Sequence, residues 1–193
     1  AWLVNEGLNY LTSGRVPVRL GNAHPNIVPY QLFDTRDGHF ILAVGNDAQF
    51  RRFCDFAGVT ELAADSRFET NSLRLANRQA LIDLLVPVMK TQTSAHWIDG
   101  LAKLGVPAGP VNDLAQVFAD EQILHRGMKI SVPDDDARGG AVELIGNPIK
   151  MSATPVSYRR PPPSLGQHTD EVLKEVLGMD DAELQKLRKQ GLI

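Results

Sequence analysis

The chain has 193 residues, of which 43% are hydrophobic and 22% charged, a composition that is typical of a globular protein and excludes a largely disordered one. Lys and Arg (20) are outnumbered by Asp and Glu (23), so the basic face of a nucleic-acid-binding protein is not expected. The single cysteine excludes an intramolecular disulfide, and without an apolar run of about 18 residues we expect no membrane span.

The first residues have the pattern of a helix. Apolar side chains at 2–4, 8 and 11 could line one face, and Ser13-Gly14 would close the last turn. The chain begins without Met, inside this pattern, and residues 1–10 lack the basic start of a signal peptide. We therefore expect a fragment of a longer, cytoplasmic protein.

Residues 15–26, rich in Gly, Pro and Asn, predict a loop. The apolar runs 27–33 and 40–44 predict two strands. Asp37-Gly38 lies between them and predicts a hairpin turn, because both residues tolerate positive φ.

Helical spacing of apolar residues predicts the next elements. Asn46 or Asp47 can cap the first of these helices, and Pro87 is expected to kink the second or end it early because proline removes a backbone donor. The expected helices are residues 47–57, 71–90, 94–104 and 113–118.

An extended segment follows these helices, and from Met128 the chain changes in character. Residues 106–111 are expected to be extended, and three short strands are predicted at 128–132, 141–145 and 149–151. The proline-rich stretch 158–163 predicts a stiff connector. Beyond it, Thr169 is expected to cap one helix, and Asp180 with Glu183 forms a capping-box pair for a last one.

The densest polar group lies at residues 21–31. Gly-Asn-Ala-His-Pro-Asn at 21–26 is followed by Tyr30-Gln31 at the start of a predicted strand. Loops of this kind place backbone N–H groups and side chains against a ligand. The alternative is a strand-entry loop whose Asn side chains only cap turns.

Other chemical signals are weak. The histidines at 24, 39, 96, 125 and 168 lack metal-ligand spacing, so no metal site is expected. The glycine-rich phosphate-binding fingerprints are absent from the sequence. Cys54, between aromatic residues, is expected to be a small buried apolar residue. The Arg159-Arg160 pair is interpreted as part of the connector in preference to a phosphate contact.

Four stretches, residues 14–31, 37–50, 105–111 and 163–173, resemble the class III CoA-transferase family in sequence and in order. They include Gly-Asn-Ala-His-Pro-Asn and the later Pro-Ser-Leu-Gly-Gln-His-Thr. The family includes formyl-CoA transferase, carnitine CoA-transferase and α-methylacyl-CoA racemase relatives. Members are about twice as long as this chain, so the resemblance is to a C-terminal half.

The resemblance implies an α/β protein in which two identical subunits interlock as a homodimer. It implies an α+β small domain with a short antiparallel sheet and packed helices, and a C-terminal arm that would return to a large α/β domain outside this chain. A linker helix and loop are expected at residues 1–24 and the small domain at 25–120. A returning connector with short strands is expected at 121–167, and C-terminal helices that dock on the large domain at 168–193.

The resemblance also implies the chemistry. Family members move CoA from an acyl-CoA to a carboxylic acid acceptor through an aspartyl acyl anhydride. That aspartate would lie outside this chain, so we expect the isolated chain to be inactive. No cofactor is expected, since the CoA thioester is a substrate. An acyl-CoA racemase, or a structural fragment without catalysis, are the alternatives.

In the family, the stretch that matches residues 21–26 lies at the active site. In formyl-CoA transferase it is a glycine-rich loop, whereas His24-Pro25-Asn26 stands here. The resemblance thus gives as candidate active-site residues Gly21, Asn22, His24, Pro25, Asn26, Tyr30 and Gln31.

Overall fold

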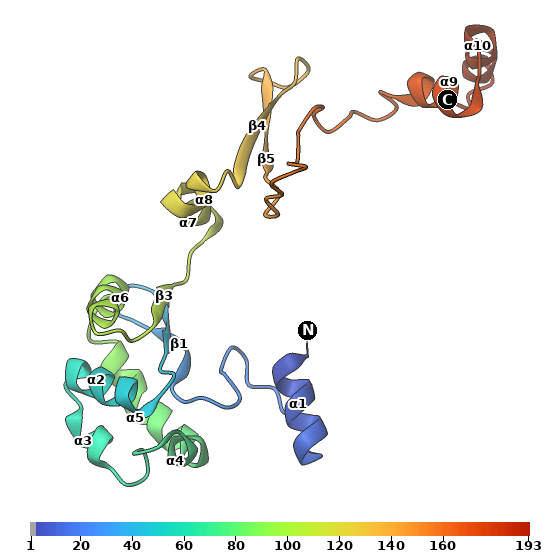
Figure 1. The fold of residues 1–193 in the computed structure, drawn as a ribbon. Coiled ribbons are helices and arrows are strands. Elements are labelled where there is room, and N and C mark those ends of the chain that lie inside the picture. The colour runs from blue at the N-terminus through green and yellow to red at the C-terminus, as the bar shows by residue number, and fades with distance from the viewer. Residues whose placement is uncertain (1–2) are drawn as a thin grey trace. The chain divides into compact units, whose positions relative to one another are not determined.

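The computed structural model describes residues 3–193, and these form two compact units that divide between Asn112 and Asp113 (Figure 1). The first unit combines helices with a small sheet. Its elements are α1 (Val4–Ser13), β1 (Tyr30–Asp34), β2 (His39–Ala43), α2 (Asp47–Ala57), α3 (Thr60–Ala64), α4 (Asn71–Ala76), α5 (Arg78–Met89), α6 (Ser94–Lys103) and β3 (Ala108–Pro110).

The three strands form an antiparallel sheet in the order β1-β2-β3, in which the pair β1-β2 is the predicted hairpin. Phe33 pairs with Phe40 across β1 and β2, and Leu42 pairs with Ala108 across β2 and β3. The turn differs from the prediction in its geometry, because neither Asp37 nor Gly38 has positive φ.

The Asp37 carboxylate stabilises this turn. Its Oδ1 accepts hydrogen bonds from the Ser94 N–H at 2.8 Å and the Thr35 hydroxyl at 3.1 Å. The bond from the Ser94 backbone lowers the pKa of the Asp37 carboxyl, because it favours the charged form. The hairpin is thereby joined to the start of α6.

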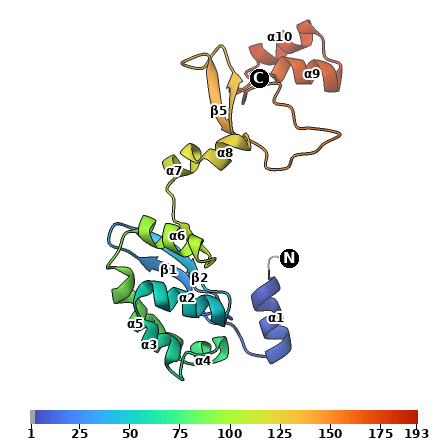
Figure 2. The ribbon, with the colours of Figure 1, turned by 60° about the vertical axis from the view of Figure 1, so that its left-hand side comes forward.

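The core of the first unit lies between the sheet and its helices. Figure 2 shows α2, α5 and α6 gathered around the strands. The Trp97 ring of α6 stacks on Phe40 of β2 with 6.2 Å between centroids, and its indole N–H donates to the Met89 carbonyl at 2.9 Å. Both aromatic residues are almost fully buried, so their contact fixes α6 against the sheet.

The helix predicted at 71–90 is divided in two. Asn77 leaves helical geometry with φ −113° and ψ 27°, and its side-chain amide donates to the Leu73 carbonyl at 2.9 Å. Asparagine competes with the helical backbone in this way, and α4 ends before it. Pro87 does not stop α5, which continues to Met89.

The second unit has less regular structure. Its elements are α7 (Leu114–Ala119), α8 (Glu121–His125), β4 (Lys129–Pro133), β5 (Ala141–Ile145), α9 (Thr169–Leu177) and α10 (Asp181–Lys189). Strands β4 and β5 pair antiparallel as a hairpin. The predicted strand at 149–151 is wrong, because no strand of the described residues pairs with it.

The caps of the second unit follow the sequence with one exception. Asp113 and Asp180 each form a capping box with the residue three positions later. Thr169 is the first helical residue of α9, and the cap position is taken by His168, whose side chain makes no capping bond. The chain as a whole thus has mixed helices and small antiparallel sheets, as the expected α+β small domain implied.

Candidate functional site

The polar turn, residues 21–31, lies between α1 and the beginning of β1 in the first unit. Gly21 has φ 61°, a left-handed conformation that favours glycine, and the chain reverses there. The Asn22 Oδ1 accepts a hydrogen bond from the Leu32 N–H at 2.8 Å. This bond attaches the turn to the edge of β1, so Asn22 has a structural partner in the sheet.

His24 is held through both its backbone and its side chain. Its N–H donates to the Tyr30 carbonyl at 2.9 Å, and its imidazole stacks on the Tyr30 ring with 5.1 Å between centroids. The Asn26 N–H donates to His24 Nδ1 at 3.0 Å. Because Nδ1 therefore presents its lone pair, the neutral ring carries its proton on Nε2.

The Nε2 atom of His24 is available to a ligand. Within residues 3–193 it has no hydrogen-bond partner, and it is not among the buried polar atoms that lack one. An N–H on a ring of fixed orientation can donate to a carbonyl or carboxylate oxygen. This atom is the best-defined donor of the polar turn.

The structure brings only some of the candidate residues together. The amide of Asn26 forms two reciprocal hydrogen bonds with the amide of Asn9 in α1, at 3.1 and 3.3 Å. Gln31 follows Tyr30 in an unbroken strand, so their side chains lie on opposite faces of β1. Gln31 shares its face with the buried Phe33 and is separated from His24.

Two side chains from the helices bind the carbonyl groups of the turn. The Arg78 guanidinium donates from Nη2 to the His24 and Pro25 carbonyls, both at 2.9 Å. The Asn71 amide donates to the Asn26 carbonyl at 2.8 Å. Three consecutive carbonyl oxygens of the turn are therefore occupied from α4 and α5.

A third side chain, Arg74, anchors the segment that follows. It is fully buried, donates from Nε to the Val28 carbonyl at 2.7 Å, and pairs through Nη2 with Asp47 at 2.8 Å. It also donates to the Phe68 carbonyl and lies over the Phe50 ring at 4.4 Å. A buried arginine is tolerated when its donors are satisfied in this way.

The sequence analysis did not identify these three residues. Asn71, Arg74 and Arg78 are spaced i, i+3 and i+7, which would place them on one face of the single helix predicted at 71–90; in the structure they lie on α4 and α5, on either side of the break at Asn77. Polar residues at this spacing, within a segment whose other periodic positions are apolar, are the sequence pattern from which these three residues could have been identified. Its meaning depended on the turn, which lies about 45 to 54 residues away.

Burial shifts the pKa values of two side chains. It raises the pKa of the Cys54 thiol to about 12, so the thiol stays protonated and is not a nucleophile at neutral pH. Cys54 is thus the buried apolar residue that its aromatic neighbours indicated. Burial also lowers the pKa of Arg78, because desolvation disfavours its charged form.

Neither a metal site nor a membrane helix is found in the described part of the chain. Among residues 3–193, no group of three or more His, Cys, Asp or Glu side chains could hold a metal ion. No helix there is long and apolar enough to cross a membrane.

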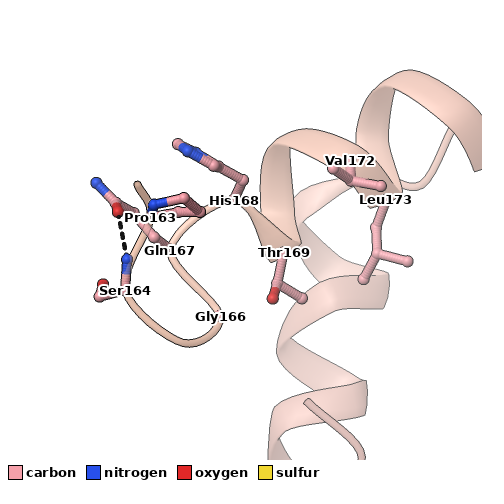
Figure 3. A pocket seen from close by; sticks show the side chains of 8 residues that line it. All are labelled: Pro163, Ser164, Gly166, Gln167, His168, Thr169, Val172 and Leu173. Atoms are coloured by element: carbon pink, nitrogen blue, oxygen red, sulfur yellow. Dashed lines mark hydrogen bonds between the residues drawn. The ribbon is translucent and has the colours of Figure 1, made fainter. Parts of the chain in front are cut away.

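A hollow lies in the second unit, along the Pro-Ser-Leu-Gly-Gln-His-Thr stretch (Figure 3). It has a volume of about 400 Å³ and is lined by residues that run from Pro163 into the first turn of α9. The Gln167 side chain accepts from the Ser164 N–H at 2.9 Å and closes the turn before the helix. The Nδ1 atom of His168 lies 3.4 Å from Oε2 of Glu171, and the same carboxylate pairs with the Arg160 guanidinium.

Comparison with known proteins finds CoA-transferases as relatives of this chain. Residues 1–169 match CoA-transferase family III. The succinate–glutarate CoA-transferase of Agrobacterium fabrum is 42% identical over 176 residues, which are 91% of this chain and 44% of that protein. The human succinyl-CoA:glutarate CoA-transferase is 37% identical over 193 residues, all of this chain and 44% of that protein.

A solved structure agrees with these relatives. A CAIB/BAIF family protein from Brucella suis is 46% identical, with a TM-score of 0.74 over 90% of this chain and 44% of that one. The chain therefore spans less than half the length of the relatives that it matches. Its similarity to them runs through the polar turn, the sheet and the helices that hold the turn, and on this ground the chain belongs to CoA-transferase family III.

Proposed function

We propose that this chain is part of an enzyme that transfers CoA from an acyl-CoA to a carboxylic acid, with dicarboxylic acids of the succinate and glutarate type as substrates. The observation that carries the proposal is the 42% identity to a succinate–glutarate CoA-transferase over 91% of the chain. The relatives named above are transferases, which favours transfer over racemisation on the same scaffold.

The proposed reaction begins outside this chain. A carboxylate of an aspartate in the remaining part of the enzyme attacks the thioester carbonyl and forms the C–O bond of an acyl anhydride. The C–S bond breaks and the CoA thiolate leaves. The thiolate then attacks the aspartyl carbonyl, which releases the donor acid and leaves an aspartyl-CoA thioester. The carboxylate of the acceptor acid displaces the thiolate and forms a second anhydride, and attack of the thiolate on the acceptor's carbonyl yields the new thioester and restores the aspartate carboxylate.

The polar turn supplies a hydrogen-bond donor in this scheme. Negative charge develops on the carbonyl oxygen as the carboxylate adds to it, and a donor that is already oriented lowers the barrier. The His24 Nε2–H has this character, because the ring is fixed by Tyr30 and by the Asn26 N–H. The amide of Asn26 is engaged with Asn9, so His24 is the stronger candidate.

We also propose that the whole enzyme is a homodimer. Both units expose apolar helix faces within the described residues, including Leu8 and Leu11 of α1 and Val176 and Leu177 of α9. Exposed apolar surface of this kind is common where another subunit or domain is bound. Sedimentation of the complete protein measures this directly, and a monomer at micromolar concentration would contradict it.

The function can be tested with a chimera. In the Agrobacterium fabrum relative, the segment that matches this chain is replaced by the chain itself, and transfer from succinyl-CoA to glutarate is measured. The proposal requires that the folded chimera transfers CoA, and that the isolated 193-residue chain stays at background. Turnover by the isolated chain would place the nucleophile within it, and a folded but inactive chimera would refute the assigned function.

The role of His24 is tested in the same chimera. Replacing His24 by Ala removes the donor and should lower kcat about 10²–10³-fold, the usual effect of losing one such donor. The matched control is His125→Ala in the last turn of α8, an exposed histidine of the second unit. An unchanged kcat and KM for the His24 variant would mean that the turn is only the entrance to the sheet.

A further inference from the structure

The polar turn is held from one side by a polar stripe on α4 and α5. Asn71, Arg74 and Arg78 make up this stripe, and Asn71 accepts a hydrogen bond from the Val28 N–H at 3.1 Å in addition to its donor bond. The carbonyl oxygens that the stripe binds belong to His24, Pro25, Asn26 and Val28. Every one of these bonds joins residues more than 40 positions apart, so the turn does not form them by itself.

Arg78 differs from Arg74 in how well it is satisfied. All three nitrogens of the Arg74 guanidinium have acceptors, one of them the Asp47 carboxylate. The Nη1 of Arg78 is buried and has no hydrogen-bond partner among residues 3–193. No carboxylate of the described residues lies within ion-pair distance of Arg78.

A contribution to the stability of the fold does not explain this arrangement of Arg78. A buried donor without an acceptor and a charge without a counter-ion are both costly, and an apolar side chain at this position would avoid both costs. What Arg78 provides is a fixed backbone: one guanidinium nitrogen binds two successive carbonyls of the turn.

We propose that Arg78 is a positioning residue of the CoA-transfer site, which fixes the His24 backbone and thereby the direction of the His24 Nε2–H. The inference rests on the proposed function. The N–H of His24 is bound by Tyr30 and its carbonyl by Arg78, so both peptide groups around the residue are held. The ring itself is held at Nδ1 and by stacking, and Nε2 remains as the donor for a substrate.

The same bonds set the electrostatics of the turn. Carbonyl oxygens are the negative ends of peptide dipoles and repel carboxylates and thioester oxygens. Arg78 and Asn71 bind the oxygens of three consecutive residues and direct them toward the helices. The positive charge of Arg78, without a carboxylate partner in the described residues, adds an attraction for an anionic substrate. A dicarboxylic acid is the class of ligand that this suits.

Three variants separate positioning from general stabilisation. Arg78→Met removes the donors and the charge but keeps a flexible apolar stem. Arg78→Lys keeps the charge and a donor but not the planar guanidinium, so it should restore part of what Met loses. Arg51→Met is the matched control, because Arg51 is an exposed arginine of α2 in the same unit, with no ion pair or hydrogen bond of its side chain in the described structure.

The first measurement uses the 193-residue chain and needs no activity. NMR of the ring nitrogens reports which nitrogen of His24 carries the proton, and amide exchange reports the Asn26 N–H. In Arg78→Met the Asn26 amide should exchange about tenfold faster, and the fixed Nε2–H tautomer should give way to a mixture, while the Leu42 amide stays within about twofold. Unchanged exchange and tautomer would overturn the inference. If Arg78→Met does not fold, the same comparison is made with Arg78→Lys.

The second measurement uses the chimera. Arg78→Met should lower kcat about 10–100-fold through misorientation of the donor, with a smaller change in KM for the acyl-CoA, and Arg78→Lys should recover part of the loss. An unchanged kcat in a folded variant would overturn the positioning role. If the unsubstituted chimera has no activity, the proposed function fails, whereas the exchange experiment still decides whether Arg78 orients His24.

Discussion

The first unit has one continuous core, in which aromatic residues of the sheet and helices are almost fully buried. Among the described residues of the second unit, the buried hydrophobic side chains are Val132 and Leu184. The second unit depends instead on capping boxes and on exposed ion pairs such as Lys174 with Asp181. A helix cap contributes about 1 kcal/mol and exposed ion pairs contribute little, whereas a buried aromatic side chain contributes several times more than a cap.

This difference explains where a precise site can be built. The polar turn is oriented by Arg74 and Arg78, and these arginines are in turn fixed by helices that pack on the core. The hollow of the second unit is lined by a short turn and one end of α9, without such support from a core. To orient a hydrogen-bond donor to within a fraction of an ångström, the supporting side chains have to lie on elements that pack on a core, as they do in the first unit.

The comparison predicts its largest effect for core truncation. Trp97→Ala should destabilise the first unit by about 3–5 kcal/mol, while Leu184→Ala in the second unit should cost about 2 kcal/mol because its surroundings can collapse. Urea unfolding followed by circular dichroism gives both values, and limited proteolysis shows which unit opens. Leu165→Ala, at a fully exposed position, is the neutral control. Equal losses for Trp97 and Leu184 would remove the distinction between the units.

A second effect of intermediate size concerns the packing density of the first unit. A Cβ added at Gly100 of α6 would overlap the Phe56 ring, so Gly100→Ala should destabilise by about 1–3 kcal/mol. At an open helical position the same change stabilises by about 1 kcal/mol. In a Phe56→Leu background, where the ring is absent, the sign should revert toward stabilisation. The four denaturation midpoints of this double-mutant cycle decide the matter, and equal effects in the two backgrounds would exclude the ring contact as the cause.

The smallest predicted effect is a dependence on pH. The pKa of Asp37 in the first unit is lowered chiefly by the Ser94 N–H, and that of Asp181 in the second by the Lys174 side chain. Each carboxylate therefore stabilises the fold above its unfolded pKa of about 3.9, and this contribution is lost as the pH falls through the lower folded pKa.

Substitution by Asn tests this. The stability difference between the wild type and Asp37→Asn should be present at pH 7 and vanish in acid, and it should appear in the unfolding of the first unit. For Asp181→Asn the corresponding pH-dependent loss of stability should appear only as faster amide exchange within α9 and α10. A stability difference that stays constant from neutral to acid pH would show that the carboxylate charge plays no part.

Local signals in the sequence were sufficient for most boundaries. Asn46 caps α2 and Thr93 caps α6, each by accepting a backbone N–H from within the next three residues. Gly14 and Gly58 end their helices in the left-handed conformation. Such interactions span about four residues, so their partners can be read from adjacent positions. The ordered motifs also sufficed to identify the family, which the comparisons confirm.

The sequence prediction missed one helix boundary and wrongly placed one strand. Asn77 divides the predicted long helix through the bond of its own side chain to the Leu73 carbonyl, and the stretch 149–151 pairs with neither β4 nor β5. The candidate residues at 21–31 and the four-part division of the chain stay predictions. The separation of Gln31 from His24 follows from the alternation of β1 only once that strand is known to begin at Tyr30.

The sequence by itself thus determined most of the helices and strands, many of their ends, and which loop carries polar groups, but it did not predict the short helices α3 and α8. The tertiary structure alone decided how that loop is held. The bonds from Arg78 to the His24 and Pro25 carbonyls join residues more than 50 positions apart. An arginine in a helical pattern reads as an exposed residue, and only the packing of α5 beside the polar turn gives its guanidinium two carbonyl oxygens to bind.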